Sequence, residues 1–250
     1  MKKIIVTSLA LSSLLLANGV DYSKTNQLTT KVNIGYVQTD GNTETTAYTL
    51  DAKAKKGFDA HMFTLTADGQ YASQKVDGDD EETKNKYLVE LQYDYEYTER
   101  LSFGYLAGYK YDKFSGYDYQ AYTGPGVKYK VIKSDQQNLS LQGNILYARD
   151  KYDHGIDGTN SAINEYTSFR AEADYDYKIL ENLTFAQQLV YRTDLEDTDT
   201  YFVTSKSDLK SKISDKMTAG ISYKVDYANE VEPGIDNTDT TLSFIVGMDF

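Results

Sequence analysis

Two histidines, His61 and His154, are the side chains best suited to acid–base chemistry in this 250-residue chain, which contains no cysteine. His154 lies in the polar run from Asp150 to Gly155, and a histidine close to carboxylates is an arrangement that hydrolases use. No second matched set of groups accompanies it, so we expect no catalytic residue, and a surface hydrolase that relies on the His154 loop is the alternative. His61 ends an apolar face and is interpreted as an imidazole at a membrane interface.

The acidic run from Asp77 to Glu82 resembles a calcium-binding loop only superficially, because it lacks the required spacing of glycine and glutamate. No glycine-rich phosphate loop occurs. We therefore expect no metal site and no cofactor, although acidic loops could hold divalent cations loosely and so bridge to lipopolysaccharide. The chain has 26 Lys+Arg against 38 Asp+Glu, a net charge of −12, which argues against a nucleic-acid partner.

A third set of candidates is a series of charged pairs whose sign alternates along the chain. If each pair ends a strand on the polar face, acids and bases can meet across roughly 12 Å, the distance between alternate strands. We interpret them as an ionic collar that narrows the periplasmic mouth of a pore. The alternative is wetted interfacial charge, with each pair contributing about 0–1 kcal/mol. The residues are Lys53, Lys55, Asp94, Glu96, Lys128, Lys130, Asp174, Asp176, Lys210, Lys212 and Asp249.

The elements that must carry these residues show a repeat of two. Between Tyr87 and Tyr97, for example, apolar and aromatic residues alternate with mostly polar ones, which predicts a strand with one apolar and one polar face. Such runs are of about ten residues, the length that a tilted strand needs to cross a bilayer. The predicted strands are Leu28–Gln38, Thr45–Lys55, His61–Ser73, Tyr87–Tyr97, Leu101–Tyr111, Tyr119–Val131, Leu139–Arg149, Glu165–Tyr177, Leu183–Arg192, Tyr201–Ile213, Met217–Tyr227 and Thr240–Phe250.

The connections alternate between short turns and longer polar loops. Long loops are expected at Gln74–Lys86, Asp150–Asn164 and Ala228–Asp239, all on one side of the sheet, which we call the loop side; the other is the turn side. This layout is typical of an outer-membrane barrel with both termini in the periplasm. Twelve tilted strands give a backbone diameter near ~24 Å, which leaves a narrow lumen once side chains are added.

Aromatic residues gather near the strand ends, and tyrosine, with 24 residues, replaces the absent tryptophan. Two such belts are typical of membrane interfaces. The alternative is a tyrosine-rich surface on a soluble periplasmic β protein. The loop-side belt comprises Tyr36, Tyr48, Tyr71, Tyr87, Tyr111, Tyr147, Tyr191 and Tyr227; the turn-side belt comprises Tyr97, Phe103, Tyr129, Tyr177 and Phe185.

The two ends of the chain carry signals of location. Residues 1–19 combine a basic start, an apolar run and the small residues Ala17 and Gly19, as in a secretory signal peptide, so residues 20–250 are expected to form the barrel. The C-terminal residues resemble the signal that the barrel-assembly machinery recognises. They are Leu242, Phe244, Val246, Met248 and Phe250.

Four inward-facing glycines, Gly104, Gly108, Gly124 and Gly126, lie on two neighbouring predicted strands. They could form a smooth wall for a solute. We favour the interpretation that they let the strands bend around Pro125, which lacks an N–H and predicts a bulge.

Three segments carry a resemblance to a known family: 33–46, with its Gly-Tyr-x-x-x-x-Gly-Asn-Thr core, 124–127 and 239–243. They resemble the family of salt-induced outer-membrane proteins, also called domain of unknown function 481. The resemblance implies a barrel and a link to osmotic or ionic stress, and it implies no substrate. The sequence as a whole predicts an all-β protein: one antiparallel transmembrane β-barrel in the cell outer membrane. The expected function is an envelope protein related to osmotic stress, acting as a narrow channel for small solutes or ions.

Overall fold

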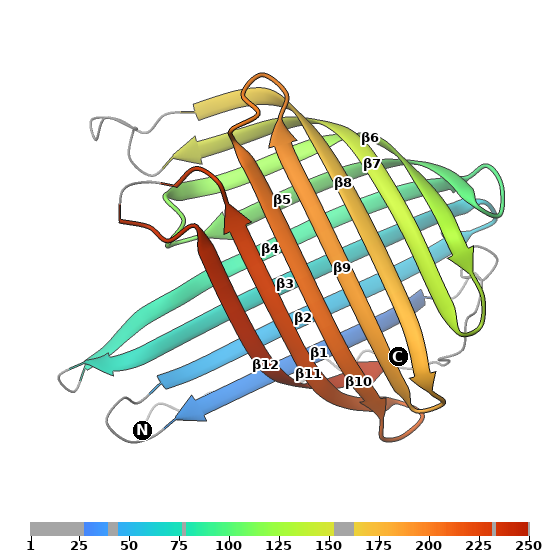
Figure 1. Ribbon diagram of the computed structural model, residues 1–250, viewed down its shortest axis with the longest axis horizontal. Coiled ribbons are helices and arrows are strands. Elements are labelled where there is room, and N and C mark those ends of the chain that lie inside the picture. The colour runs from blue at the N-terminus through green and yellow to red at the C-terminus, as the bar shows by residue number, and fades with distance from the viewer. Residues whose placement is uncertain (1–27, 40–44, 77–78, 153–162, 232–233, 250) are drawn as a thin grey trace.

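Twelve antiparallel strands form a closed barrel, which confirms the predicted fold (Figure 1). The computed structural model describes residues 28–39, 45–76, 79–152, 163–231 and 234–249. Within these ranges no helix has the length and apolar character to cross a membrane. The strands are β1 (Leu28–Thr39), β2 (Thr45–Phe58), β3 (His61–Val76), β4 (Asp79–Glu96), β5 (Leu101–Asp112), β6 (Tyr117–Lys133), β7 (Gln137–Tyr152), β8 (Ile163–Leu180), β9 (Leu183–Asp194), β10 (Tyr201–Lys212), β11 (Met217–Ala228) and β12 (Thr238–Asp249).

The apolar residues of each alternating run point away from the lumen. On β4, Tyr87, Val89 and Leu91 are exposed on the outer face, whereas Gln92 and Asp94 are buried inside. A sheet protein in water would bury the first set and expose the second. This inverted arrangement belongs to a barrel whose outer face meets lipid, and it excludes the soluble alternative.

Outward tyrosine rings at the loop side form several runs in which neighbouring rings touch. The outward rings of Tyr36 and Tyr48 lie 5.2 Å apart, and Tyr87 and Tyr111 are also 5.2 Å apart. On the opposite part of the wall, Tyr201 joins Tyr191 and Tyr227, each at 5.9 Å. Amphipathic rings at this level mark the edge of the hydrocarbon layer.

The predicted loop Gln74–Lys86 is wrong, because β3 and β4 continue into it as a hairpin that extends beyond the tyrosine belt. A register shift between Ala72 and Ser73 marks the place where the hairpin leaves the barrel wall. Beyond this point both faces of the hairpin meet water, so the alternation of apolar and polar residues on which the prediction rested is lost.

The predicted bulge at Pro125 is also wrong. The β6–β7 pairs on either side of Pro125 keep one register, and the ladder is only interrupted at the proline. The neighbouring glycines do not form a smooth wall either. The ring of Tyr122 occupies the space that a Cβ at Gly108 would need, and at Gly124 the backbone of β7 approaches closely.

We expect Gly124→Ala to destabilise the barrel by about 1–3 kcal/mol, as overpacking does. A Cβ at this position would lie 2.1 Å from the carbonyl oxygen of Ile145. This oxygen belongs to the backbone of a paired strand, so it cannot rotate away as a flexible side chain could. The matched control is Gly143→Ala, whose Cβ would meet only the ring of Phe169 at 3.8 Å. Urea unfolding in lipid vesicles measures both variants. Equal stability of the two would contradict the close approach.

Candidate functional site

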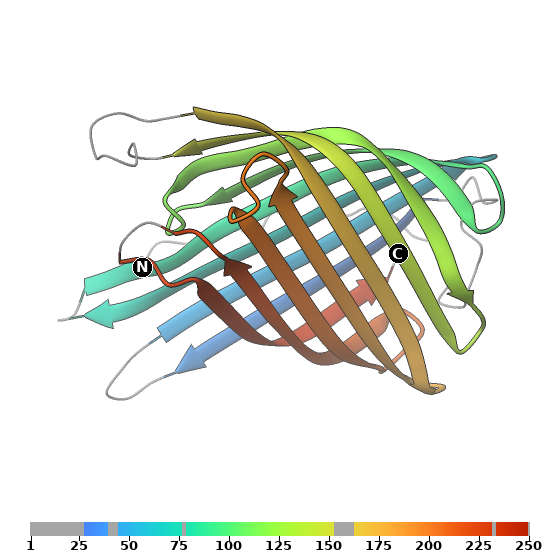
Figure 2. The same cartoon turned by 45° about the horizontal axis from the view of Figure 1, so that its top comes forward.

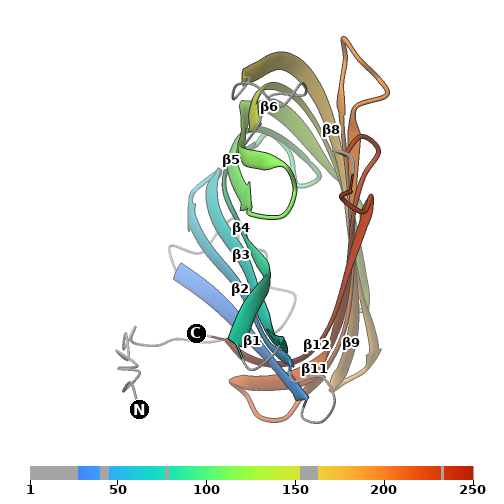
Figure 3. The same cartoon turned by 90° about the vertical axis from the view of Figure 1, so that its left-hand side faces the viewer.

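The barrel is elongated in cross-section, so that β2, β3 and β4 face β10, β11 and β12 across a narrow lumen (Figure 3). Charged side chains from the two walls meet in the middle. They form one continuous series of alternating sign, which we call the lumen charge chain. Its members are Asp51, Lys206, Asp68, Lys224, Asp226, Lys86, Asp239 and Lys84.

At mid-barrel the chain is built around Asp68 of β3. Lys206 of β10 pairs with Asp51 and lies 3.9 Å from Asp68, and Lys224 of β11 lies 2.8 Å from Asp68. Each of these contacts joins opposite walls of the barrel. Charges held away from bulk water are stable only when paired, so the two walls are electrostatically tied.

Toward the loop side the chain continues through β4. Lys86 of β4 bridges Asp226 at 2.7 Å and Asp239 at 2.6 Å, and Lys84 lies 2.8 Å from Asp239. Lys224 approaches Asp226 at 3.7 Å and thereby connects the two parts of the chain. The side chain of Lys86 is almost fully buried among these carboxylates.

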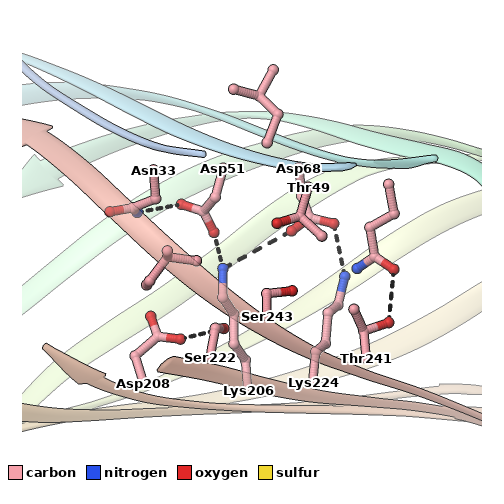
Figure 4. A pocket seen from close by; sticks show the side chains of 13 residues that line it. Asn33, Thr49, Asp51, Asp68, Lys206, Asp208, Ser222, Lys224, Thr241 and Ser243 are labelled. Atoms are coloured by element: carbon pink, nitrogen blue, oxygen red, sulfur yellow. Dashed lines mark hydrogen bonds and ion pairs between the residues drawn. The ribbon is translucent and has the colours of Figure 1, made fainter. Parts of the chain in front are cut away.

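A small cavity lies beside the mid-barrel part of the chain (Figure 4). Its volume is about 30 Å³, room for roughly one or two water molecules. Hydrogen bonds hold the polar groups around it: Ser222 donates to Asp208 at 2.5 Å, and Thr241 donates to Gln70 at 3.0 Å. The cavity is lined mostly by polar residues, with acidic and basic groups on opposite walls.

The part of the lumen between β4 and β8 is filled by a compact cluster. Its apolar members are Leu88, Leu106, Tyr122, Leu146, Ala148 and Tyr166. Leu106 and Leu146 occupy inward positions of their strands, where alternation predicts polar residues, so sequence reasoning missed this cluster. The sequence did contain a sign of this cluster. Leu106 and Leu146 fall at inward positions of the alternating pattern, and the residues next to them on the outward face are apolar as well.

Two buried arginines complete this filled part. Arg170 of β8 binds Glu172 at 2.6 Å and lies 3.4 Å from Glu90, whose carboxylate also accepts a hydrogen bond from Tyr122 at 2.5 Å. Arg192 of β9 donates to the hydroxyl of Tyr166 at 3.1 Å. The small cavity lies on the other side of the lumen, between β1–β3 and β10–β12.

Two contacts join predicted collar residues across β5. Lys128 lies 3.1 Å from Asp94, and Lys130 lies 2.9 Å from Glu96. The register explains both pairs, because Ser102 and Gly104 on the intervening strand are too small to separate the long side chains.

The other collar residues have different surroundings. Lys210 binds Asp208 of its own strand at 2.8 Å, and Lys212 binds Asp215 in the adjoining turn at 3.0 Å. Asp174 accepts a hydrogen bond from Gln188 at 3.3 Å. Lys53 and Lys55 are half-buried on β2, where Lys55 interacts electrostatically with Lys128 and Asp174, and Asp176 is exposed; the side chain of Asp249 lies outside the described residues.

The remaining candidates are placed as follows. His61 lies on the outer face, with its Nδ1 atom 2.8 Å from the hydroxyl oxygen of Tyr93. His154 and residues 1–19 lie outside the described part of the chain, as does Phe250. The other assembly-signal residues point outward from β12: Leu242, Phe244, Val246 and Met248.

Among the described residues, no group of three or more histidine or acidic side chains could hold a metal ion. The described part of the acidic run, Asp79 to Glu82, lies in the projecting hairpin. Its Glu82 is already paired with Lys113, and the hydrogen bond between them lowers the pKa of Glu82 and raises that of Lys113.

Solved structures with a similar arrangement include porins and an autotransporter. The NanC porin shares 16% identity at a TM-score of 0.49, covering 90% of this chain and 99% of that chain. The KdgM porin shares 14% identity at a TM-score of 0.44, and the match covers 88% of this chain and 98% of that chain. The translocator domain of autotransporter NalP from Neisseria meningitidis shares 11% identity at a TM-score of 0.43, and the match covers 93% of this chain and 90% of that chain.

No curated protein matches the chain. One family does: the family described as "Protein of unknown function, DUF481" matches residues 32–250, which includes every described strand except the first few residues of β1. The protein therefore belongs to this family.

Proposed function

We propose that the protein is an outer-membrane channel for small ions, held closed at rest by the lumen charge chain. The observation that carries this proposal is that paired charges from opposite walls span a membrane barrel beside a cavity lined mostly by polar residues. A barrel needed only as a structural element could fill its lumen with apolar residues, as the part between β4 and β8 is filled.

Conduction requires the chain to separate for short periods. Lys206, Asp68 and Lys224 retain some exposure to the lumen, so water can replace part of each ion pair. Once separated, the carboxylates offer successive sites to a cation and the ammonium groups offer sites to an anion, as charged rings do in other pores. The free energy of separation then sets the fraction of time that the pore is open.

A role in osmotic or ionic stress follows from the same chemistry. Between about 0.1 M and 1 M salt the Debye length falls from ~10 Å to ~3 Å, which weakens partly exposed ion pairs. Higher ionic strength therefore favours the open pore. We also propose that the collar narrows the periplasmic mouth, that the terminal strand is read by the barrel-assembly machinery, and that the acidic loops contact lipopolysaccharide through divalent cations.

Recording in planar bilayers tests this function. We expect discrete current steps from the refolded wild-type protein, with a total current that rises more steeply with salt than the bulk conductivity does. Absence of current both from the wild type and from a variant in which the chain is broken would overturn the channel.

The collar is tested separately with Asp94→Asn combined with Glu96→Gln. These changes free Lys128 and Lys130 from their partners, so we expect a larger conductance and a shift towards anions. An unchanged current and salt dependence would show that these pairs are wetted interfacial charge and do not narrow the pore.

A further inference from the structure

Three polar side chains gather on the outer face of the barrel, on β9 and β10, which lie side by side in Figures 1 and 2. They are Gln187, Ser205 and Ser207, and we call them the outer polar patch. Their outward direction follows from the alternation of each strand, because the neighbouring Gln188 and Lys206 bind acidic groups inside the lumen. The register places Gln187 directly opposite Ser207.

The patch lies in the part of the outer face that meets the hydrocarbon layer. Ser207 is near the middle of β10, which begins at Tyr201, and the ring of Tyr201 touches the tyrosines of the loop-side belt. Outward residues in the middle of other strands of the same length are apolar: Ile34 of β1 is 57% exposed and Ile221 of β11 is 42% exposed. The outer polar patch therefore interrupts the apolar surface that a membrane barrel shows to lipid.

Hydrogen bonds within the patch use only part of its capacity. The side-chain amide of Gln187 donates to Ser205 at 3.1 Å and to the carbonyl oxygen of Gln188 at 3.0 Å, and it accepts from Ser207 at 2.5 Å. Within the described residues, the hydroxyl hydrogen of Ser205 reaches no acceptor and the hydroxyl oxygen of Ser207 receives no donor. By contrast Thr123, also on the outer face, donates to a backbone carbonyl of β5 at 3.0 Å. The patch thus presents a donor and an acceptor to a medium that satisfies neither.

The groups left over make the patch complementary to itself. When a two-fold axis brings two patches together, the Ser205 hydroxyl of each copy can donate to Ser207 or Gln187 of the other, and both exchanges occur at once. The relief of the surface also permits close approach. The register places Leu189, which is 46% exposed, between the small outward residues Ala173 and Ser205, so it forms a ridge with low ground on both sides.

We propose that the outer polar patch is the contact surface of a dimer, formed in the membrane by two copies of this chain related by a two-fold axis. Lipid tails offer no hydrogen bonds, whereas a second copy offers the groups that each patch lacks. The ridge at Leu189 then packs onto the low ground of the other copy. The dimer goes beyond the proposed channel and does not depend on conduction.

Energy transfer between fluorescent copies tests the dimer. The chain has no cysteine, so Lys216→Cys, in the exposed turn between β10 and β11, gives a single position for a dye. Donor-labelled and acceptor-labelled protein are mixed, refolded into lipid vesicles and diluted with further lipid. We expect transfer to persist at dilutions at which chance proximity disappears. Transfer that falls to the level of chance would overturn the proposal, and it would leave the patch as a tie between β9 and β10 or as a site for a different protein.

A variant without the polar groups tests the patch itself. Gln187→Leu combined with Ser205→Ala and Ser207→Ala makes this face apolar, which suits lipid, and heat-modifiable gel migration checks that the barrel still forms. We expect energy transfer to fall severalfold. The control is Leu50→Ala with Leu65→Ala, two exposed outward positions on β2 and β3, which should leave the transfer unchanged. Equal transfer in the wild type and the patch variant would overturn the proposal.

Cross-linking locates the contact and needs no change to the polar groups. We expect the single-cysteine variant Leu189→Cys to give a disulfide-linked dimer when vesicles are treated with a membrane-permeable oxidant. Leu65→Cys, equally exposed on the outer face of β3, should stay monomeric. A dimer from Leu65→Cys alone would place the contact on another wall, and monomers from both variants would mean that the ridge meets lipid; either result overturns the proposal.

Discussion

Replacing Arg170 by methionine is expected to lower the free energy of unfolding by about 3–5 kcal/mol, the loss typical of breaking a buried ion pair. The Arg170 side chain is only 4% exposed and binds Glu172 at 2.6 Å, with Glu90 at 3.4 Å. Methionine fills a similar volume but leaves both carboxylates buried without a cation. The lost energy is therefore mainly that of two unpaired charges.

The matched control is Arg149→Met. Arg149 pairs with Glu165 at 3.5 Å, but their side chains are 45% and 47% exposed, so the loss should stay within about 1 kcal/mol. Urea unfolding in lipid vesicles measures both variants under the same conditions. Similar losses for the two arginines would mean that water reaches Arg170, and that the part of the lumen between β4 and β8 is not filled.

Breaking the lumen charge chain should change the current more than any other substitution. In the variant Lys206→Met with Lys224→Met, Asp51 and Asp68 lose the cations that bind them. The mid-barrel ties between the walls are then gone, whereas those made by Lys84 and Lys86 remain, and the mid-barrel lumen is acidic. We expect a severalfold higher conductance and a strong preference for cations.

The mirror variant, Asp51→Asn with Asp68→Asn, removes both carboxylates that pair with Lys206 and leaves Lys224 with Asp226 alone, so it should prefer anions. Reversal potentials in a salt gradient separate the two variants by their opposite signs. Lys216→Met is the control, since Lys216 is exposed in the turn between β10 and β11 and belongs neither to the collar nor to the lumen charge chain, so this change should leave the current unaltered. A shift of the same sign in both variants would place the current outside the lumen charge chain.

Alternation was enough to predict the strands, because lipid on one side and polar groups on the other impose opposite demands on successive residues. It failed where that contrast disappears. In the hairpin of β3 and β4 both faces meet water, and at Leu106 and Leu146 both faces of the strand are apolar. Neither region could be predicted by a rule that assumes one wet and one dry face.

Contacts in the candidate site join strands that are far apart in the sequence, so predicting them requires more than the alternation within one strand. Lys128 and Asp94 could be matched because two successive hairpins fix their relative height. Lys86 and Asp226 lie 140 positions apart in the chain, and their contact requires both the register of every intervening strand and the elongated cross-section. Lys84, Lys86 and Asp239 fall in segments that the sequence predicts as loops, so neither their inward position nor their partners could be predicted.

The junction that closes the barrel, where β1 pairs with β12 from Lys31–Asp249 to Gly35–Ile245, is shorter among the described residues than the other junctions, and this affects how the barrel assembles. Eleven of the twelve ladders join strands that are consecutive in the chain, so they form as hairpins with little loss of loop entropy. The last ladder must bring together segments more than 200 positions apart, and within the described residues five pairs form in it. Pairing of β1 with β12 is therefore a late step of folding with a small gain in free energy. We expect the same junction to separate first when the protein denatures.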